Sequence, residues 1–535
     1  MLSILREDET VYDIILKGGT IVDGTGGPAR AADLAISGGK IALIADHIDA
    51  PAAETVDVSG LAVAPGFIDS HSHSDSSCLI EGSTQSKIYQ GVTTEVAGQC
   101  GHTPFPSGKG EGNEPDGATE GKAGAFTAPS MEAFIQRAES ENRKMSTNLI
   151  LLVGHGSVRN AVIGSENRKV TASELEQMKE LLDADMRAGA WGLSLGLGYA
   201  PGVSSDQDEL NEMGAVVAKY DGIVTSHMRN QGVGTPQSLE EMYKIHRYSG
   251  VKVHISHYKV SGKANWGRAD EFVEWIHAAQ REGIKVSVDV YPYRASSSGI
   301  TNSWPHWAIQ GGREAAVSRT FNEERPALLA ELDKRFATPE DGDGLYVVTT
   351  HGKFPIADGK TIRQIAEDLG VSMSEAILEV TRQTGAGATC ISFSMCDDDV
   401  MVMLAQDDFA IGSDGRGFSM DPAECEGKPH PRNFGTFPRF LRLARENDLC
   451  SLETAVHRMT GLPKDIMEIP DRGVLKEGYV ADITVFDPKT VSDTGSFDDP
   501  IRKNTGIHHV LLGGEFALRD GEQTSLRAGR FLRKR

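Results

Sequence analysis

The feature that most constrains the fold is a set of ligand-type residues that end apolar, strand-like runs. The segment FIDSHSHSD places His71 and His73 two residues apart after the run LAVAPGF, so both imidazoles leave the same face of an extended chain. Later runs end in Cys100 (GVTTEVAGQCG), His227 (GIVTSH), His257 (VHISH) and Asp414 (FAIGSD). Because a β/α barrel brings the carboxyl ends of its strands to one face, this distribution predicts a single site assembled in a barrel.

A lone His-x-His pair is often an ordinary surface or core pair, so the weight of this pattern comes from its repetition along the chain. His, Cys and Asp close apolar runs over a span of roughly 340 residues. Imidazole and thiolate are the ligands that zinc prefers. The repetition therefore indicates a metal site rather than a chance pair.

Length and charge agree with an enzyme that acts on a small molecule. A chain of 535 residues should form more than one domain. It carries 54 Lys and Arg against 76 Asp and Glu, and the net charge of -22 argues against nucleic acid or an anionic membrane as partner. The six cysteines have no CxxC spacing, and the sequence MLSILREDET does not resemble a signal peptide. We therefore expect a cytoplasmic protein without disulfides, while the sequence does not predict how many subunits assemble.

Alternating strand patterns with Gly-Gly turns occur near both ends of the chain, in YDIILKGGTIVDGTG and in GIHHVLLGGEFALRDGE. They predict a small β-sandwich or β-barrel domain built from residues 1–64 and 470–535. Strands alternate with helical patterns between them, which predicts an α/β fold, a (β/α)8 TIM-like barrel over 65–469, with a lid-like insertion at about 295–350. The Gly-rich segment SGKGEGNEPDGATEGKAGAF reads as a loop near the barrel mouth.

The predicted ligands suggest a division of chemical roles. Cys100, His227 and His257 leave a fourth tetrahedral position for water, as a catalytic zinc site requires. His71 and His73 could complete a second site, and a water activated there could attack near neutral pH. Asp414 is placed to accept the proton of that water and pass it to a departing nitrogen.

A set of motifs occurs along the chain in this order: FIDSHSHSD, GVTTEVAGQCG, TSHMRN, HISHYKVSGKANWG, VYPY, IGSDG, HPRNFGTFPR and ADITVFDP. Together these motifs resemble those of the N-acyl-D-amino acid deacylases (D-aminoacylases) of the amidohydrolase superfamily. The resemblance implies zinc-dependent hydrolysis of N-acyl-D-amino acids to a carboxylate and a free D-amino acid. It implies one tightly bound zinc held by Cys100, His227 and His257, and a weaker second site formed by His71 and His73 with Cys100 and Asp414. Cys100 would replace the carbamylated lysine of other amidohydrolases.

A free α-carboxylate on the substrate requires cations near the same strand ends. Lys259 follows His257 by two residues, so it shares the strand face if the extended geometry continues. The resemblance adds Tyr291 from the YPY motif and Arg432 from the HPR motif. Among the arginines, Arg416 and Arg439 are alternatives to Arg432 for the carboxylate.

The preferred side chain of the substrate is less constrained. Trp304 and Trp307 in RASSSGITNSWPHW favour a neutral or hydrophobic side chain, whereas Arg294 in the same segment could meet the carboxylate of an N-acyl-D-glutamate or N-acyl-D-aspartate. A cyclic-amide hydrolase of the hydantoinase or dihydroorotase kind is a further alternative, although its ring substrate would leave the proposed cations unpaired. A scaffold protein that kept the fold but lost the chemistry would not need the complete ligand set.

Overall fold

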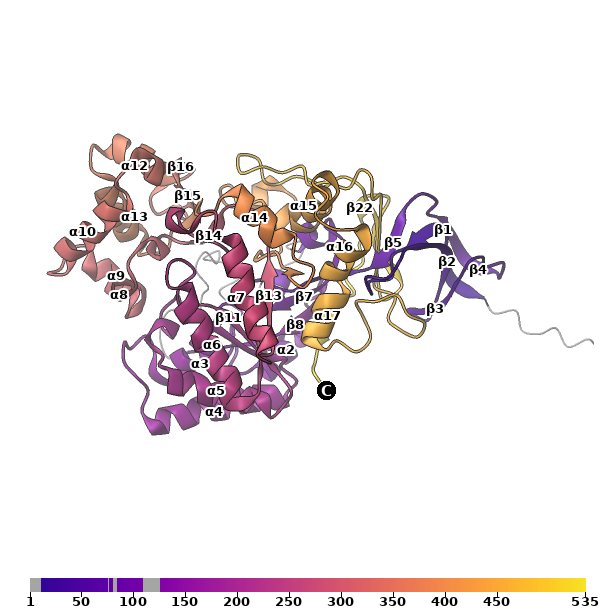
Figure 1. The fold of residues 1–535 in the computed structure, drawn as a ribbon, viewed down its shortest axis with the longest axis horizontal. Coiled ribbons are helices and arrows are strands. Elements are labelled where there is room, and N and C mark those ends of the chain that lie inside the picture. Colours follow the sequence, from indigo (N-terminus) through magenta and orange to yellow (C-terminus); the bar gives the residue numbers. More distant parts are fainter. Residues whose placement is uncertain (1–10, 76, 80–83, 109–125) are drawn as a thin grey trace, which may run out of the picture.

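The computed structural model describes residues 11–75, 77–79, 84–108 and 126–535. Three regions follow one another along the long axis of the molecule: a β-rich region at one end, a central region of strands surrounded by helices, and a largely helical region at the other end (Figure 1). Most of the predicted Gly-rich loop lies outside the described residues. The central region carries the candidate site.

Segments from the two ends of the chain form one nine-stranded sheet, with the strand order β22-β21-β20-β19-β5-β1-β2-β3 and with β4 paired to β1. The junction between the two ends is the antiparallel pairing of β5 with β19, in which Val63 faces Val485. Gly38 and Gly39 have positive φ in the turn between β2 and β3. Gly18 and Gly19 instead lie inside β1, where the pairing with β2 shifts register between Leu16 and Gly19, so the turn expected at this Gly-Gly pair is wrong. The strands of this sheet are β1 (Tyr12–Ile21), β2 (Arg30–Ser37), β3 (Lys40–Ala45), β4 (Ala52–Asp57), β5 (Ala62–Pro65), β19 (Ile483–Phe486), β20 (Ile507–Leu512), β21 (Glu515–Arg519) and β22 (Glu522–Gln523).

The last strand of the chain departs from the predicted 470–535 segment of the terminal sheet. Strand β23 (Phe531–Leu532) pairs in parallel with β8 in the central region, where Phe531 faces Leu149. The backbone N–H of Leu149 also donates to the carbonyl of Arg530 at 2.8 Å. The apolar side chains of this short segment therefore pack against the central region instead of the terminal sheet.

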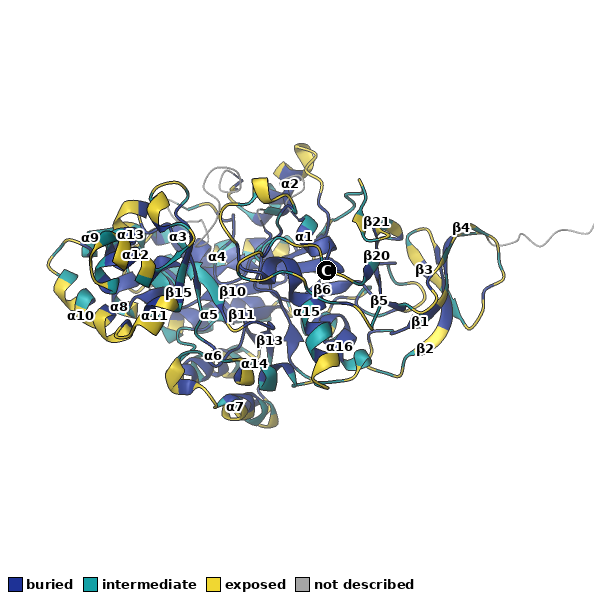
Figure 2. Cartoon of the chain, turned by 90° about the horizontal axis from the view of Figure 1, so that it is seen from above, coloured by how far each residue is buried: buried dark blue, intermediate teal, exposed yellow. Residues whose placement is uncertain are grey.

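The central strands are parallel and belong to two sheets, with orders β23-β8-β7-β6 and β18-β13-β12-β11-β10-β9. A parallel bridge between Ser72 and Gly415 connects the loops that follow β6 and β18. Figure 2 shows these strands buried, with exposed residues on the outer faces of the helices, as continuous apolar strand sequences require. The strands are β6 (Phe67–Asp69), β7 (Val92–Ala97), β8 (Asn148–Leu151), β9 (Val153–Gly154), β10 (Gly192–Gly196), β11 (Ile223–His227), β12 (Lys252–Ile255), β13 (Val286–Val290) and β18 (Ala410–Ile411).

Helices connect the central strands, and α4 illustrates why they form where they do. Thr171 caps the first turn of the helix and forms a capping box with Glu174. Met178, Leu182 and Met186 recur at helical spacing and are buried. The helices in this part of the chain are α3 (His155–Ile163), α4 (Ala172–Arg187), α5 (Gln207–Ala218), α6 (Thr235–Ser249) and α7 (Ala269–Arg281).

The insertion is longer than the range 295–350 predicted from the sequence. It contains an antiparallel sheet of order β14-β17-β15-β16, made of β14 (Ser296–Gly299), β15 (Leu345–Thr349), β16 (Lys360–Thr361) and β17 (Thr389–Ser392). Helices including α10 (Arg325–Arg335), α12 (Ile362–Leu369) and α13 (Met373–Thr384) pack with this sheet around a separate hydrophobic cluster. Two apolar runs of the sequence beyond residue 340, LYVVTTHG and ATCISFSM, contain strands β15 and β17 of this sheet.

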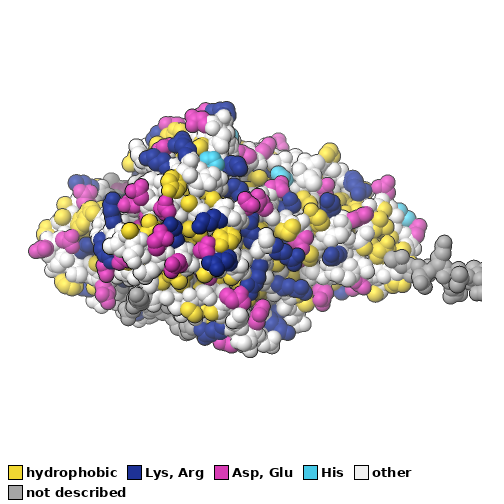
Figure 3. Space-filling model, turned by 90° about the horizontal axis from the view of Figure 1, so that it is seen from below, with side chains coloured by type: hydrophobic (Ala, Val, Ile, Leu, Met, Phe, Trp, Pro, Cys, Tyr) yellow, Lys and Arg dark blue, Asp and Glu magenta, His cyan; other side chains and the backbone are white. Residues whose placement is uncertain are grey.

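Acidic and basic side chains are interspersed over the face of the molecule drawn in Figure 3. No helix in the described part of the chain is long and apolar enough to cross a membrane.

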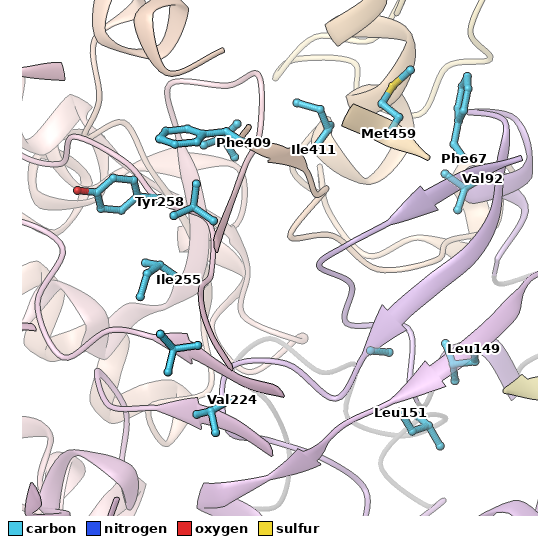
Figure 4. Packing of buried hydrophobic residues seen from close by; sticks show 14 of the residues in the cluster. Phe67, Val92, Leu149, Leu151, Val224, Ile255, Tyr258, Phe409, Ile411 and Met459 are labelled. Carbon is cyan, nitrogen blue, oxygen red and sulfur yellow. The ribbon is translucent and has the colours of Figure 1, made fainter. Parts of the chain in front are cut away.

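The core of the central region forms where apolar strand residues meet. Leu149, Val224, Ile255 and Ile411 come from four different strands and belong to one buried cluster (Figure 4). Burial of an aliphatic side chain of this size stabilises the fold by about 1.5–3 kcal/mol. This packing fixes the strand ends, from which the site residues project.

Candidate metal centre

Three predicted ligands have a left-handed backbone immediately after a strand. The φ angles are 55° at Cys100, 38° at His257 and 50° at Asp414. For a residue other than glycine, such a conformation costs about 1–3 kcal/mol and is concentrated at functional sites. The strands end before these residues, so it is a turn of the backbone, and not the alternation of an extended strand, that directs the side chains into the site.

This turn corrects the reasoning by which Lys259 was predicted. Strand β12 ends at Ile255, and the extended geometry does not continue through His257. Lys259 nevertheless lies on the wall of the same cavity as His257. Lys259 therefore reaches the cavity because of the turn at His257, and not because the two residues share a strand face.

Four ligand-type side chains converge at the strand ends. The ligand atoms of His71, Cys100, His257 and Asp414 all lie within 4.8 Å of one another, and all four residues are buried. The Sγ of Cys100 is 3.5 Å from Nε2 of His71 and 3.4 Å from Nε2 of His257. A thiol, two imidazoles and a carboxylate in such a cluster are a suitable ligand set for zinc.

The two remaining predicted histidines flank this cluster. His227 Nδ1 lies 3.0 Å from His257 Nε2 and 3.8 Å from Cys100 Sγ. His73 Nε2 lies 3.1 Å from Asp414 Oδ1. The structure therefore brings all six predicted metal-site residues together, with Cys100 and Asp414 lying between the His227–His257 pair and the His71–His73 pair.

The electrostatics of the histidines suit metal binding. Burial lowers the pKa of His227 and His257 well below the usual value, and the nearby charge of Lys259 lowers it further. Burial also lowers the pKa of His73 to about 4. These imidazoles are therefore neutral near pH 7, which is the form that donates a lone pair to a metal.

Asp414 is ionised in spite of its burial. Burial opposes the charge, but Arg432 and the neighbouring histidines hold the pKa of the carboxyl well below its usual range. The Oδ2 atom of Asp414 accepts a hydrogen bond from Nη1 of Arg432 at 2.7 Å. Oδ1 faces His73, so the two oxygens have different environments.

A cavity of about 510 Å³ opens over this cluster. The site residues on its wall are His73, Cys100, His227, His257, Lys259, Asp414 and Arg432. The insertion contributes polar residues such as Ser297 and apolar ones such as Phe336, Leu345 and Val348. The cavity is therefore bounded by both the central strand ends and the insertion.

The predicted carboxylate-binding residues lie together, although Tyr291 is not on the cavity wall. Nζ of Lys259 is 5.1 Å from the centroid of the Tyr291 ring, and the guanidinium carbon of Arg432 is 5.2 Å from it. Lys259 forms no ion pair with a carboxylate among the described residues. The hydroxyl of Tyr291 is buried and has no hydrogen-bond partner within the same part of the chain.

The two alternative arginines have different surroundings. Arg439 donates to the carbonyl of Pro292 and pairs with Asp493 at 3.0 Å, away from the cavity wall. Arg416 does line the cavity. Of the three arginines predicted for the carboxylate, Arg432 and Arg416 can therefore reach a bound molecule.

The residues used to predict the side-chain preference are not on the cavity wall. Trp304 is buried in the hydrophobic cluster of the insertion, and Trp307 packs against that cluster. Arg294 is exposed and lies 3.6 Å from Asp397. The sequence could not distinguish a tryptophan of a pocket from one that stabilises the insertion, so these three residues support neither side-chain preference.

Two buried charged groups behind the site were missed in the sequence. Lys87 donates to Asp69 at 2.6 Å and to Ser413 at 2.8 Å, and thereby connects the chain before His71 with the chain before Asp414. Asp289 lies at the end of β13 and contacts two of the predicted ligands. Asp289 had a detectable signal, because it is a carboxylate inside the otherwise apolar end of the run VSVDV, whereas Lys87 lies in a sequence that reads as a solvent-exposed helix.

Comparison with known proteins gives matches over almost the whole chain. The model of the amidohydrolase family matches residues 54–333 and 402–517. The chain is 36% identical to the D-aminoacylase of Alcaligenes xylosoxydans xylosoxydans over 530 residues, which cover 98% of this chain and 99% of that protein. A crystal structure of a D-aminoacylase superposes with a TM-score of 0.83 at 33% identity, covering 98% of this chain and 100% of the other.

A second solved structure was determined with ligands bound. It is the N-acyl-D-glutamate deacylase of Bordetella bronchiseptica in complex with zinc and a phosphonate inhibitor that mimics the tetrahedral intermediate. It superposes with a TM-score of 0.81 at 31% identity and covers 98% of this chain and 100% of the other.

Proposed function

Because this chain belongs to the amidohydrolase family and is similar to D-aminoacylases over its whole length, we propose that it hydrolyses the amide bond of N-acyl-D-amino acids to a carboxylate and a free D-amino acid. The observation that carries the proposal is the position of Cys100, whose Sγ lies between 3.4 and 3.8 Å from ring nitrogens of His71, His227 and His257. The preference for the D enantiomer rests on the relatives.

The cofactor in this proposal is zinc. Cys100, His227 and His257 form the tight site, and His71 and His73 with Cys100 and Asp414 form a weaker second one. When bound, zinc polarises the carbonyl of the substrate and makes a water molecule acidic enough to attack near neutral pH. The neutral imidazoles of His227 and His257 lie 3.8 and 3.4 Å from Sγ of Cys100, which supports this assignment.

Asp414 performs the proton transfers. Because its carboxylate is ionised at neutral pH, Oδ1 can take a proton from the attacking water. Arg432 opposes protonation of the same group, so the neutral carboxylic acid that results is a strong donor. It then gives the proton to the departing nitrogen as the carbon–nitrogen bond breaks, and the carboxylate is regenerated.

Lys259, Tyr291 and Arg432 bind the α-carboxylate of the substrate. Lys259 supports this role because it is a buried ammonium on the cavity wall without a carboxylate partner among the described residues. The Tyr291 hydroxyl has no hydrogen-bond partner among the described residues, and the centroid of its ring lies 5.1 Å from Nζ of Lys259. A carboxylate that binds between the two cations would neutralise charge that burial otherwise makes costly.

For the fold, we propose that the central parallel strands close into a β/α barrel. The bridge between Ser72 and Gly415 supports closure, because it joins the loops after β6 and β18. The nine-stranded sheet would form a separate small domain, with boundaries near residues 64 and 470. The insertion would run from about 295 to the end of β17 at Ser392. The acidic and basic side chains interspersed on the face drawn in Figure 3, together with the net charge of -22, support a small-molecule substrate rather than nucleic acid.

The side-chain preference has two candidates. Phe336, Leu345 and Val348 on the cavity wall favour a neutral or hydrophobic side chain. Arg335 favours an acidic one, since its side chain lines the cavity and forms no ion pair or hydrogen bond with the rest of the described chain.

The test is hydrolysis of N-acetyl-D-methionine, N-acetyl-L-methionine and N-acetyl-D-glutamate by zinc-loaded and metal-stripped protein. Zinc-dependent cleavage of the D-methionine compound without the L compound would support the first candidate. Preferential cleavage of N-acetyl-D-glutamate would support the second. Cleavage of none of these compounds by the zinc-loaded protein would contradict the proposed function.

A further inference from the structure

Asp289 is a fully buried carboxylate that belongs to no role assigned above. It lies in β13, is 0% exposed and is not on the cavity wall. Oδ1 accepts the backbone N–H of His257 at 2.8 Å, and Oδ2 lies 3.4 Å from Nδ1 of His71. One carboxylate therefore touches both halves of the metal centre from behind.

The contact with His71 determines which ring nitrogen faces the cluster. Nδ1 of His71 is directed at Asp289, and Nε2 is directed at Cys100 and Asp414, 3.5 and 3.6 Å away. A carboxylate in this position favours the proton on Nδ1 and leaves Nε2 available as a ligand.

The contact with His257 stabilises an unusual backbone. His257 has a φ of 38°, and its N–H donates to Asp289 in this conformation. The space between Asp289 and His71 leaves no room for a side chain at position 412. A Cβ on Gly412 would lie 3.0 Å from Oδ1 of Asp289 and 2.8 Å from Cβ of His71. The close approach of these elements explains why position 412 is a glycine.

Asp289 is itself held in place by the neighbouring strand. Nε2 of His254 lies 2.8 Å from Oδ2 of Asp289, and Nδ1 of His254 lies 2.8 Å from the Ser287 hydroxyl. His254 and Ser287 are paired in the register of β12 with β13. The carboxylate thus has a rigid support that extends from the sheet to the ligand His71.

From these contacts we propose that Asp289 is a positioning residue that fixes the distance between the two halves of the metal centre. It holds His71 and the turn at His257 on either side of Cys100, so that both halves can share this thiolate. The inference rests on the proposed zinc site, and it assigns to Asp289 and His254 a task that the sequence did not indicate.

The experiment measures zinc affinity of the full-length protein by competition with a chromogenic chelator, together with the absorption spectrum of the cobalt-substituted protein. In Asp289→Asn, the side chain keeps its shape but has one acceptor oxygen for three neighbouring donors. The zinc dissociation constant should rise about 10- to 100-fold, as for other carboxylates behind metal-bound histidines, and the cobalt spectrum should change. The KM of the zinc-saturated variant should stay near that of the parent, because Asp289 does not line the cavity.

Asp482→Asn is the matched control, because Asp482 is another buried aspartate with several donors but lies in the terminal sheet region. If both variants lose zinc equally, or if Asp289→Asn keeps the parent affinity and spectrum, the proposal is overturned. If Asp289→Asn does not fold, His254→Gln provides the measurement: weaker zinc binding supports the proposal and unchanged binding overturns it. A parent protein that binds no zinc would instead refute the proposed metal site itself.

Discussion

The substitution Asp414→Asn tests the proposed chemistry most directly. A positioned general acid–base group contributes about 10²- to 10⁴-fold to turnover, which corresponds to about 3 to 5 kcal/mol of barrier. The structure predicts that the effect is on proton transfer and not on folding. In the parent protein, Oδ2 of Asp414 accepts from Arg432 at 2.7 Å, and Oδ1 lies 3.1 Å from Nε2 of His73. In the variant, the asparagine oxygen can accept from Arg432 and the asparagine NH₂ group can donate to the neutral His73. The tight zinc site proposed above does not include Asp414, so we expect zinc to remain bound.

The assay follows release of D-methionine from N-acetyl-D-methionine, with zinc content measured by mass spectrometry on the same samples. Glu426→Gln is the control, because Glu426 is another carboxylate on the cavity wall and bonds to His351, away from the proposed mechanism. Asp414→Asn should retain zinc and lose turnover, while the control should retain both. Turnover of Asp414→Asn within about tenfold of the parent would refute the assignment of the general base.

Four further outcomes follow from the same geometry. Cys100→Ala should weaken zinc binding by about 100-fold or more, while removal of the buried thiol at Cys78 should leave it unchanged; equal zinc content in both would move the site elsewhere. Lys259→Met should raise KM for the free acid by about 10- to 100-fold, and the variant and the parent should act alike on an N-acyl amino acid amide. Arg432→Met removes a cation that lowers the pKa of the general base, so the acid limb of the kcat/KM profile should move to higher pH; an unmoved limb would contradict this. Arg335→Met should reduce cleavage of N-acetyl-D-glutamate relative to N-acetyl-D-methionine, and an unchanged ratio would exclude it as a specificity residue.

The sequence predicted the residues that the structure brings together at the candidate metal centre. His71, Cys100, His227, His257 and Asp414 each follow an apolar run, and parallel strands bring their carboxyl ends to one face. The order of motifs also predicted the family, which the comparisons confirm. These features could be read because strand patterns and ligand types are local properties of the chain.

Only the tertiary structure decided how these residues are held. The left-handed turns at Cys100, His257 and Asp414 depend on neighbouring strands, and they replaced the extended geometry assumed from spacing. Trp304 is likewise buried by apolar residues of the insertion that lie far from it in the sequence, so the residues next to it could not show whether it faces the cavity.

The role of Asp289 shows the physical reason for this division. Its oxygens meet His71 and His257 from other strands, so its contacts exist only after the sheet has aligned residues that lie far apart in the chain. Sequence spacing determined which side chains end the strands. Packing between strands determined their protonation, their backbone conformation and the distances between them.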